Sequence, residues 1–293
     1  MTQLITQVRS EAPTGARALK ALSAAVGVSR ATFYRQHSHA AQRPTTAASE
    51  TQLRQAIHHI AAHSNYGYRP MTAALRRGGL IANHKRVLRL MREESLLGQP
   101  RRSFVITTNP APPPAVFPNL ARELVVNDID QLWVADITFI RLPRQFVYLA
   151  VLLDAFSRRV IGWSLERHLR TELTLTALRR ALRKRQVTPA LVHHSDRGVQ
   201  YAAADYVSLL VKHRIRISMS RSGNPYDNAQ AERFMRTIKH EEVLLSEYQT
   251  LAEARASIGR FIEHVYNRKR LHSALGYLPP VEFERRLSPS ISA

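Results

Sequence analysis

Two stretches of sequence, LWVADITFI at residues 132–140 and FVYLAVLLDA at residues 146–155, decide the fold. Both are rich in β-branched and aromatic residues, and the turn-like RLPRQ separates them, so they predict two neighbouring strands. The segment SRRVIGWSL at residues 157–165 predicts a third strand. Asp136 stands in the middle of the first apolar strand, where an unpaired buried carboxylate is costly. It therefore faces either the core or a functional site.

Downstream of these strands, strand and helix patterns alternate. We expect a helix, a short buried strand, a second helix and a further strand, at residues 171–186, 191–195, 202–213 and 215–220. This order predicts an α/β fold in which a mixed sheet carries helices on both faces. A further helix is expected to begin near Asp227, which forms a capping-box pattern with Gln230. A last amphipathic helix, at about residues 251–266, leads into a basic tail, NRKRLHSALGYLPP.

The segment before the strands has a helical pattern and divides into two helix-turn-helix-like units. The first, residues 1–45, contains ALKALSAA, a turn at Gly27 and a predicted N-cap at Ser29, directly before Arg30. In the second, residues 46–98, Asn83 is a predicted N-cap for HKRVLRLMREESLL. One face of that helix carries Lys85, Arg89 and Arg92, and the opposite, apolar face carries Val87, Leu90 and Met91.

Either helical unit can read DNA or can be a small bundle with a solvated basic face. The overall charge favours DNA, because 43 Lys and Arg against 22 Asp and Glu give a formal charge of +21 and a pI of about 11.2. The candidate DNA contacts in these units are Arg30, Lys85, Arg86 and Arg89. Six of the 15 prolines fall between Pro100 and Pro118, which predicts a linker over residues 99–124.

Composition excludes several classes of protein. The chain has no cysteine, which excludes disulfide scaffolds, thiol catalysis and cysteine zinc sites. The imidazoles of HHIAAH, at residues 58–63, have helical spacing without a nearby fourth ligand, so we predict a solvated face and no zinc. The longest apolar stretch is too short to cross a bilayer, and the N-terminus lacks a signal-peptide pattern. We expect a cytoplasmic, nucleoid-associated protein with no membrane partner.

Three carboxylates have the arrangement of a metal site. Asp136 is at a strand centre, Asp196 ends the short strand LVHHS, and Glu232 lies in the helix expected to begin near Asp227, with 35 residues between the last two. Taken singly, they read as a salt-bridged sheet residue, a turn residue and a solvated helix residue. Together they can converge on one site with hard oxygen ligands, which suit Mg²⁺ or Mn²⁺. Two such ions could support two-metal transfer of a phosphodiester.

Five blocks of sequence carry a resemblance to a known family. In chain order they are WVADITFI, VYLAVLLDAFSRRVIGW, HHSDRGVQYAA, SRSGNPYDNAQAERFMRTIKHEEV and YNRKRLHSALGYLPPVEFE. They closely resemble the retroviral-integrase-like core of bacterial insertion-sequence transposases of the IS-three family, the OrfB product, over roughly residues 125–285. The 35-residue gap is similar to that family's Asp-Asp-(35)-Glu signature. Many relatives have Thr where this chain has Ala135, a non-ligand position.

The resemblance implies a ribonuclease-H-like, integrase-type core over residues 125–246, followed by a C-terminal helix and basic tail over residues 247–293. It implies that Asp136, Asp196 and Glu232 are catalytic and bind the metals, and that the reaction is cleavage of insertion-sequence ends followed by 3′-hydroxyl strand transfer. The implied partners are terminal-repeat DNA, target DNA, further copies of the chain on DNA, and an OrfA product as partner or fusion. Two alternatives remain: a non-catalytic DNA-binding regulator or inactive remnant, and a ribonuclease-H-type or Holliday-junction nuclease.

Neighbouring residues complete the set of candidates. Arg236 and Lys239 lie four and seven residues after Glu232, so we expect both cations on its helix face, directed at phosphates. The alternative is that they pair with nearby carboxylates or solvent. His194 is either a site contact or a packed core residue, and Asn228 is a candidate for shaping the start of the Glu232 helix. Asp154 is expected to form a turn.

Overall fold

The computed structural model describes residues 49–97, 117–221 and 225–287. The first helix-turn-helix-like unit, with its candidate Arg30, lies outside these residues, as does most of the expected linker. In the described part of the chain, none of the helices has both the length and the apolar character that a membrane span requires.

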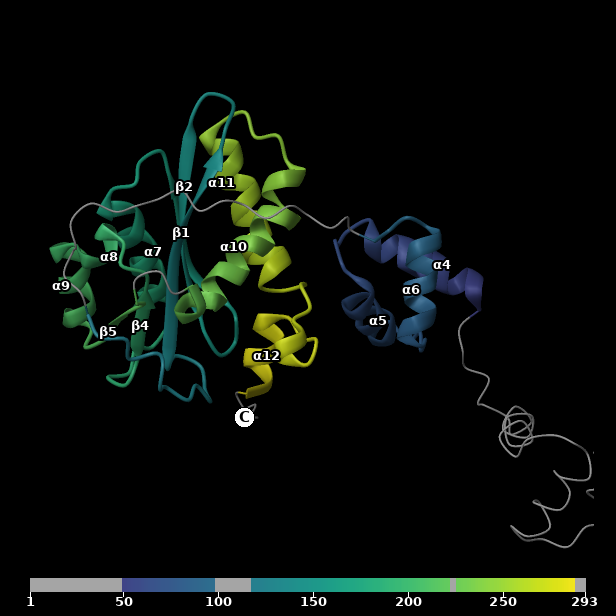
Figure 1. The fold of residues 1–293 in the computed structure, drawn as a ribbon, viewed down its shortest axis with the longest axis horizontal. Helices are drawn as coiled ribbons and strands as arrows, with labels where there is room; N and C mark the ends of the chain where they lie inside the picture. The colour runs from purple at the N-terminus through teal and green to yellow at the C-terminus, as the bar shows by residue number, and fades with distance from the viewer. Residues whose placement is uncertain (1–48, 98–116, 222–224, 288–293) are drawn as a thin grey trace, which may run out of the picture.

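A five-stranded mixed sheet forms the centre of the larger domain (Figure 1). Its strands, all predicted from the sequence, are β1 (Leu132–Arg141), β2 (Phe146–Asp154), β3 (Val160–Glu166), β4 (Val192–Ser195) and β5 (Arg216–Met219). Their order is β3-β2-β1-β4-β5. β2 runs antiparallel to both of its neighbours, whereas β1, β4 and β5 are parallel. The expectation of a mixed sheet is confirmed.

Helices cover both faces of the sheet, as predicted. Figure 1 shows the sheet nearly edge-on between two layers. One layer contains α7 (Thr171–Lys184), α8 (Val199–Ala202) and α9 (Ala204–Lys212), and the other contains α10 (Ala229–Glu241) and α11 (Leu251–Arg260). Along β1, Trp133 and Ala135 pack into the α7 layer, while Leu132 and Val134 pack into the α10 layer. Because side chains alternate along a strand, Asp136 belongs to the α10 side.

Close packing of α7 on β3 requires a glycine. A Cβ atom added at Gly162 would lie 2.2 Å from the carbonyl oxygen of Ala177, far inside contact distance. The absent side chain therefore lets the helix backbone lie directly on the strand, which fixes that layer against the sheet.

The segment after α11, which contains the sequence described above as a basic tail, is packed on the core. α11 continues into a π-helical turn (Phe261–Tyr266), a short 3₁₀ helix (Ser273–Leu275) and α12 (Pro280–Leu287). The side-chain amide of Asn267 donates to the Val160 carbonyl and accepts from the Val160 N–H, each at 3.0 Å. Val281 N–H donates to the Asn267 carbonyl. These bonds tie the segment to β3, and their partners are too distant in sequence to be predicted.

The smaller helical unit consists of α4 (Glu50–Ala61), α5 (Tyr68–Arg77) and α6 (His84–Glu93). Asn83 caps α6, because its side chain accepts a hydrogen bond from the Lys85 N–H, as predicted. The predicted apolar face is also buried, in a core that consists of Leu53, Ile57, Met71, Leu75, Val87, Leu90 and Met91. The sequence analysis did not predict α4, which begins with a capping box between Ser49 and Gln52.

Candidate functional site

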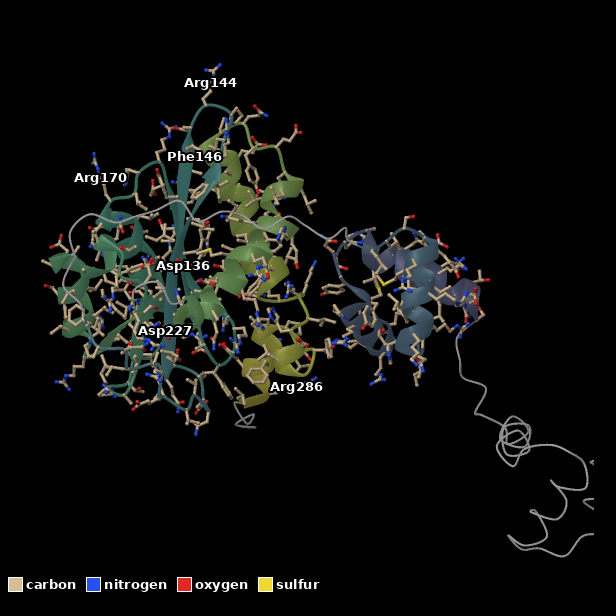
Figure 2. The ribbon with its side chains drawn as sticks, viewed as in Figure 1. Asp136, Arg144, Phe146, Arg170, Asp227 and Arg286 are labelled. Atoms are coloured by element: carbon tan, nitrogen blue, oxygen red, sulfur yellow. The ribbon has the colours of Figure 1, made fainter. Side chains whose placement is uncertain are left out.

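Asp136 lies where two parallel strands separate. β4 pairs with β1 only from Leu132 to Val134, so β1 continues past Asp136 with β2 as its one pairing strand. Asp136 is half-buried, and its Oδ1 accepts a hydrogen bond of 2.8 Å from the Ile137 N–H. In Figure 2 it stands near the middle of β1, between the two helical layers. The strand therefore presents a carboxylate beside an open strand edge.

Asp196 follows directly on the end of β4. Its Oδ1 accepts the Gly198 N–H at 3.0 Å, so it forms a turn while its side chain stays exposed. A Cβ atom at Gly198 would lie only 3.0 Å from that same oxygen and 3.2 Å from Gln200 Oε1. Sequence analysis missed this role of Gly198, for which the signal was a glycine two residues after the carboxylate. Asp196 is therefore both the residue that forms the turn and a residue of the candidate site.

Glu232 lies in the first turn of α10 and is exposed. The expected cap for this helix is wrong: Asp227 lies in a preceding 3₁₀ helix (Pro225–Asn228), and Asn228 is the N-cap residue, without a side-chain cap bond. The Asp227 carboxylate instead accepts hydrogen bonds from the Asn119 amide and from the backbone and guanidinium of Arg221. These donors occupy the carboxylate, which is therefore not available to cap the helix.

Asn228 connects the start of α10 to the strand that carries Asp136. Its side-chain amide donates a 3.0 Å hydrogen bond to the carbonyl of Ala135. Asn228 is 6% exposed, and its Oδ1 is buried without a partner among the described residues. The bond holds the N-cap residue of the Glu232 helix against the residue that precedes Asp136.

The three carboxylates share one electrostatic neighbourhood. Burial first, and then the negative charge of Asp196, raise the pKa of Asp136 to about 7; Glu232 adds to this effect, and the ammonium group of Lys239 opposes it. Burial also raises the pKa of Glu232, which Arg236 partly offsets. Within the described residues, none of the three carboxylates forms an ion pair.

These carboxylates do not form a closed cluster. Over residues 49–97, 117–221 and 225–287, no group of three His, Asp or Glu side chains lies close enough to hold a metal ion. The donor chemistry nevertheless fits a hard divalent cation, because all three groups are carboxylates and nearby cations offset their mutual repulsion only in part. A cation is the group that would favour the charged form of Asp136.

His194 is a buried, fully hydrogen-bonded residue. Its Nδ1 lies 2.8 Å from the Ser218 hydroxyl and its Nε2 lies 3.0 Å from the Ser220 hydroxyl. Both ring nitrogens are therefore engaged, and the side chain is 0% exposed. This is the packed arrangement that sequence analysis kept as the alternative to a site contact. Asp154 forms the expected turn, since its Oδ1 accepts from the N–H groups of Phe156 and Ser157.

The candidate cationic side chains differ in their exposure and in whether a carboxylate pairs with them. Arg236 is exposed, and Lys239 is half-buried with its Nζ 4.8 Å from the ring centroid of Phe139. In the helical unit, Lys85 is exposed and Arg86 is half-buried. Arg89 instead pairs with Glu50 of α4 at 2.9 Å and with Glu93 at 2.8 Å. The sequence did not reveal this pairing because α4 was not predicted.

Comparison with known proteins gives matches over most of the chain. Family models described as integrase core domain match residues 127–225 and 213–280, and one described as HTH-like domain matches residues 48–104. The uncharacterized 31 kDa protein of insertion element IS600 from Shigella sonnei is 34% identical, over 89% of this chain and 96% of that protein. Transposase InsF for insertion sequence IS3A from Escherichia coli K12 is 33% identical, over 92% of this chain and 94% of the relative. The transposase for IS904 from Lactococcus lactis is 36% identical, over 75% and 87%.

Solved structures with similar folds include retroviral integrase cores. The HTLV-2 integrase catalytic core domain in complex with magnesium is 16% identical with a TM-score of 0.43, over 53% of this chain and 96% of that one. The catalytic core domain of BIV integrase is 19% identical with a TM-score of 0.41, over 54% and 95%.

Proposed function

Because this chain belongs to the insertion-sequence transposases of the IS3 family, we propose that it acts as a DNA transposase through Asp136, Asp196 and Glu232. Its core has the integrase-type, ribonuclease-H-like fold, preceded by an HTH-like domain. The proposed reaction cleaves the ends of the element and then joins a freed 3′-hydroxyl to a second phosphodiester.

One observation carries the assignment of the three residues. The carboxylates of Asp196, after β4, and of Glu232, in α10, both act on the pKa of Asp136 in β1. They come from three separate elements, and no ion pair within the described residues neutralises any of them. Such like-charge crowding at an open strand edge supports a site that binds a cation in its working state.

Asp136, Asp196 and Glu232 would hold Mg²⁺ or Mn²⁺, as one ion or two. When bound, such ions help to activate the attacking hydroxyl and to stabilise the leaving oxygen of a phosphodiester. The protein's own part is to position these carboxylates. Asn228 fixes α10 against β1, and the turn at Gly198 sets the direction of Asp196. Arg236 and Lys239 lie on the same helix as Glu232 and would bind DNA phosphates.

DNA is the partner that the family implies, and the remaining partners belong to the proposal. The HTH-like domain would bind the terminal repeats, with Lys85 and Arg86 as its freer cations. Target DNA would approach the carboxylate side of the core. We expect several copies of the chain to assemble on DNA, and an OrfA product to assist as partner or fusion.

The experiment that tests the function separates joining from hydrolysis. A linear DNA ending in the pre-cleaved inverted repeat that flanks the gene is incubated with the full chain, a plasmid target and Mg²⁺, with and without the product of an overlapping upstream frame. Covalent joining of the end to plasmid supports a transposase. Hydrolysis without joining would indicate a nuclease, and end binding without either reaction would indicate a regulator or remnant. Asp136→Asn serves as the matched control, since it is nearly isosteric.

A further inference from the structure

Two large aromatic side chains lie exposed on neighbouring strands of the catalytic sheet. Phe139 of β1 is 58% exposed and Phe146 of β2 is 46% exposed. Their rings meet edge to face, with centroids 5.6 Å apart. Figure 2 shows Phe146 near the turn of this hairpin, with Asp136 further along the sheet. Folding leaves both rings in water, so burial in the core does not account for them.

Each ring has a cation beside it. Lys239 Nζ lies 4.8 Å from the Phe139 ring centroid, and the Arg141 guanidinium lies 5.8 Å from the Phe146 ring centroid. Both distances are within the range of a cation–π contact. We call these four residues, Phe139, Phe146, Lys239 and Arg141, the aromatic strip.

The aromatic strip begins beside the candidate catalytic carboxylate. Phe139 is three residues beyond Asp136, which is about 10 Å along an extended strand, and because side chains alternate its ring projects from the opposite face of the sheet. Lys239 links the two, because it contacts Phe139 and also lies close enough to Asp136 for their charges to interact. Because β4 pairs with β1 only as far as Val134, this edge of β1 is open, and an unpaired DNA strand with one phosphodiester at Asp136 would pass round it, beside Lys239, to reach the rings.

We propose that the aromatic strip is a stacking platform for unpaired bases of the DNA strand whose phosphodiester lies at Asp136. This inference rests on the proposed function. Bases of any sequence have an apolar π-face that stacks on an exposed aromatic ring, and Lys239 and Arg141 would pair with the adjoining phosphates. The platform acts on DNA whose terminal base pairs have opened, so it favours frayed or single-stranded ends over closed duplex.

The charges of the aromatic strip favour DNA over a second copy of the chain. Two such strips would bring four cations together on molecules that each carry a formal charge of +21. A polyanion with flat apolar bases complements both the rings and the cations.

Binding without divalent metal tests the platform separately from catalysis. The affinity of the full chain is measured in EDTA for a blunt duplex and for the same duplex with a short unpaired thymidine overhang at either end. A 2-aminopurine in the overhang reports stacking through loss of its fluorescence. The variants are Phe139→Leu/Phe146→Leu, which keeps apolar bulk without an aromatic face, and Phe139→Tyr/Phe146→Tyr, which keeps the rings. Val211→Ala is the control, since Val211 is 61% exposed on α9, a helix that contributes no residue to the strip.

We expect the wild-type chain to prefer the overhang and to quench 2-aminopurine. The double Leu variant should lose about tenfold in affinity for the overhang and most of the quenching, with no change on blunt duplex. The double Tyr variant and Val211→Ala should behave as wild type. Equal affinity of the wild type for both DNAs, or an unchanged preference in the double Leu variant, would overturn the proposal. So would a loss accompanied by conversion from oligomer to monomer in light scattering, which would make the strip a protein interface. These binding measurements do not depend on catalysis by the three carboxylates. Failure of the proposed function would therefore leave them unchanged.

Discussion

The Asn228 side-chain amide donates a hydrogen bond of 3.0 Å to the Ala135 carbonyl. This bond crosses from the start of α10 to β1, and it joins positions 93 residues apart in the sequence. Asp136 follows Ala135, and Glu232 lies one turn after Asn228. The separation of these two carboxylates therefore depends on a buried contact between their own elements.

Asn228→Asp should impair the chemical step. The substitution keeps the side-chain shape but replaces the amide donor with an acceptor, which then faces the Ala135 carbonyl. We expect a loss of about 1–3 kcal/mol in the free energy of unfolding. We also expect strand transfer to fall by about 100-fold through misplacement, with little change in end affinity. Asn127→Asp is the matched control, because the exposed Asn127 side chain acts only as an acceptor, for Gln131. Wild-type transfer rates in Asn228→Asp would show that the contact does not position the site.

Asp136→Asn should stabilise the metal-free protein near neutral pH. The folded pKa of Asp136 is about 7, above its usual 3.8. The folded state therefore holds a proton that the unfolded state has lost, and stability declines as pH rises from about 4 to 7. The variant has no carboxyl group to titrate at this position, so it does not show this decline. Its free energy of unfolding should exceed that of wild type by at most about 4 kcal/mol, at 1.36 kcal/mol per pKa unit. Thermal unfolding in EDTA should show a higher Tm for the variant at pH 8 and equal values near pH 4. A variant that is less stable than wild type at pH 8 would contradict the crowding of charge at Asp136.

Sequence patterns predicted the sheet well because its strands are apolar and their side chains alternate. The order of motifs placed Asp136, Asp196 and Glu232 on a strand, a strand end and a helix, and the structure has them there. Contacts that depend on distant partners were not predictable. Asp227 was expected to cap a helix, but its carboxylate accepts a hydrogen bond from Asn119, 108 residues away. Arg89 was expected on a free basic face, but Glu50 pairs with it.

α12 is another helix that the sequence did not predict, and a buried glutamate anchors it. Glu284 is 7% exposed and accepts hydrogen bonds from the Ser157 hydroxyl, Arg159 and Arg185. An eight-residue helix that begins at the second of two prolines has too weak a pattern to be predicted, and the partners of Glu284 lie about a hundred residues away or more.

Glu284→Ala should destabilise the protein by about 3–5 kcal/mol, because it leaves the buried Arg185 with one weaker partner, Asp130. Glu282→Ala, which removes a more exposed pair with Arg77, should cost about 0–1 kcal/mol. Urea unfolding of both variants checks the difference. Equal losses would show that α12 is not anchored through Glu284.

The ion pair between Glu284 and Arg185 also makes the stability of the protein depend on pH in the acid range. Burial alone would raise the pKa of Glu284, but Arg185, with Ser157 and Arg159, holds it below the usual 4.5. The contribution of Glu284 to stability is therefore complete above about pH 4.5 and is lost as pH falls through the lower folded pKa. Wild type and Glu284→Gln should converge in Tm as the pH is lowered from 5 toward 3. A difference that stays constant over this range would argue against an ionised Glu284.

Arg236→Ala/Lys239→Ala should weaken binding to a pre-cleaved end. For each cation–phosphate pair that the substitutions remove, the slope of log K against log salt should fall by about 0.9 on duplex DNA, or about 0.7 on a single strand. Lys212→Ala/Arg216→Ala removes the same charge from exposed positions of α9 and β5 and is the matched control. Equal slopes for the two double variants would show that the effect comes from net charge alone. They would reject a specific role of Arg236 and Lys239 in DNA binding.

The joining of a pre-cleaved end to target DNA in Mg²⁺ tests the three carboxylates most directly. It is measured for wild type and for Asp136→Asn, Asp196→Asn and Glu232→Gln, with end affinity determined in parallel. Each variant is expected to lose joining while keeping end affinity within a few-fold of wild type, because the change removes a ligand charge and leaves the fold intact. Near-wild-type joining by any one variant would contradict the assignment of that residue to the site.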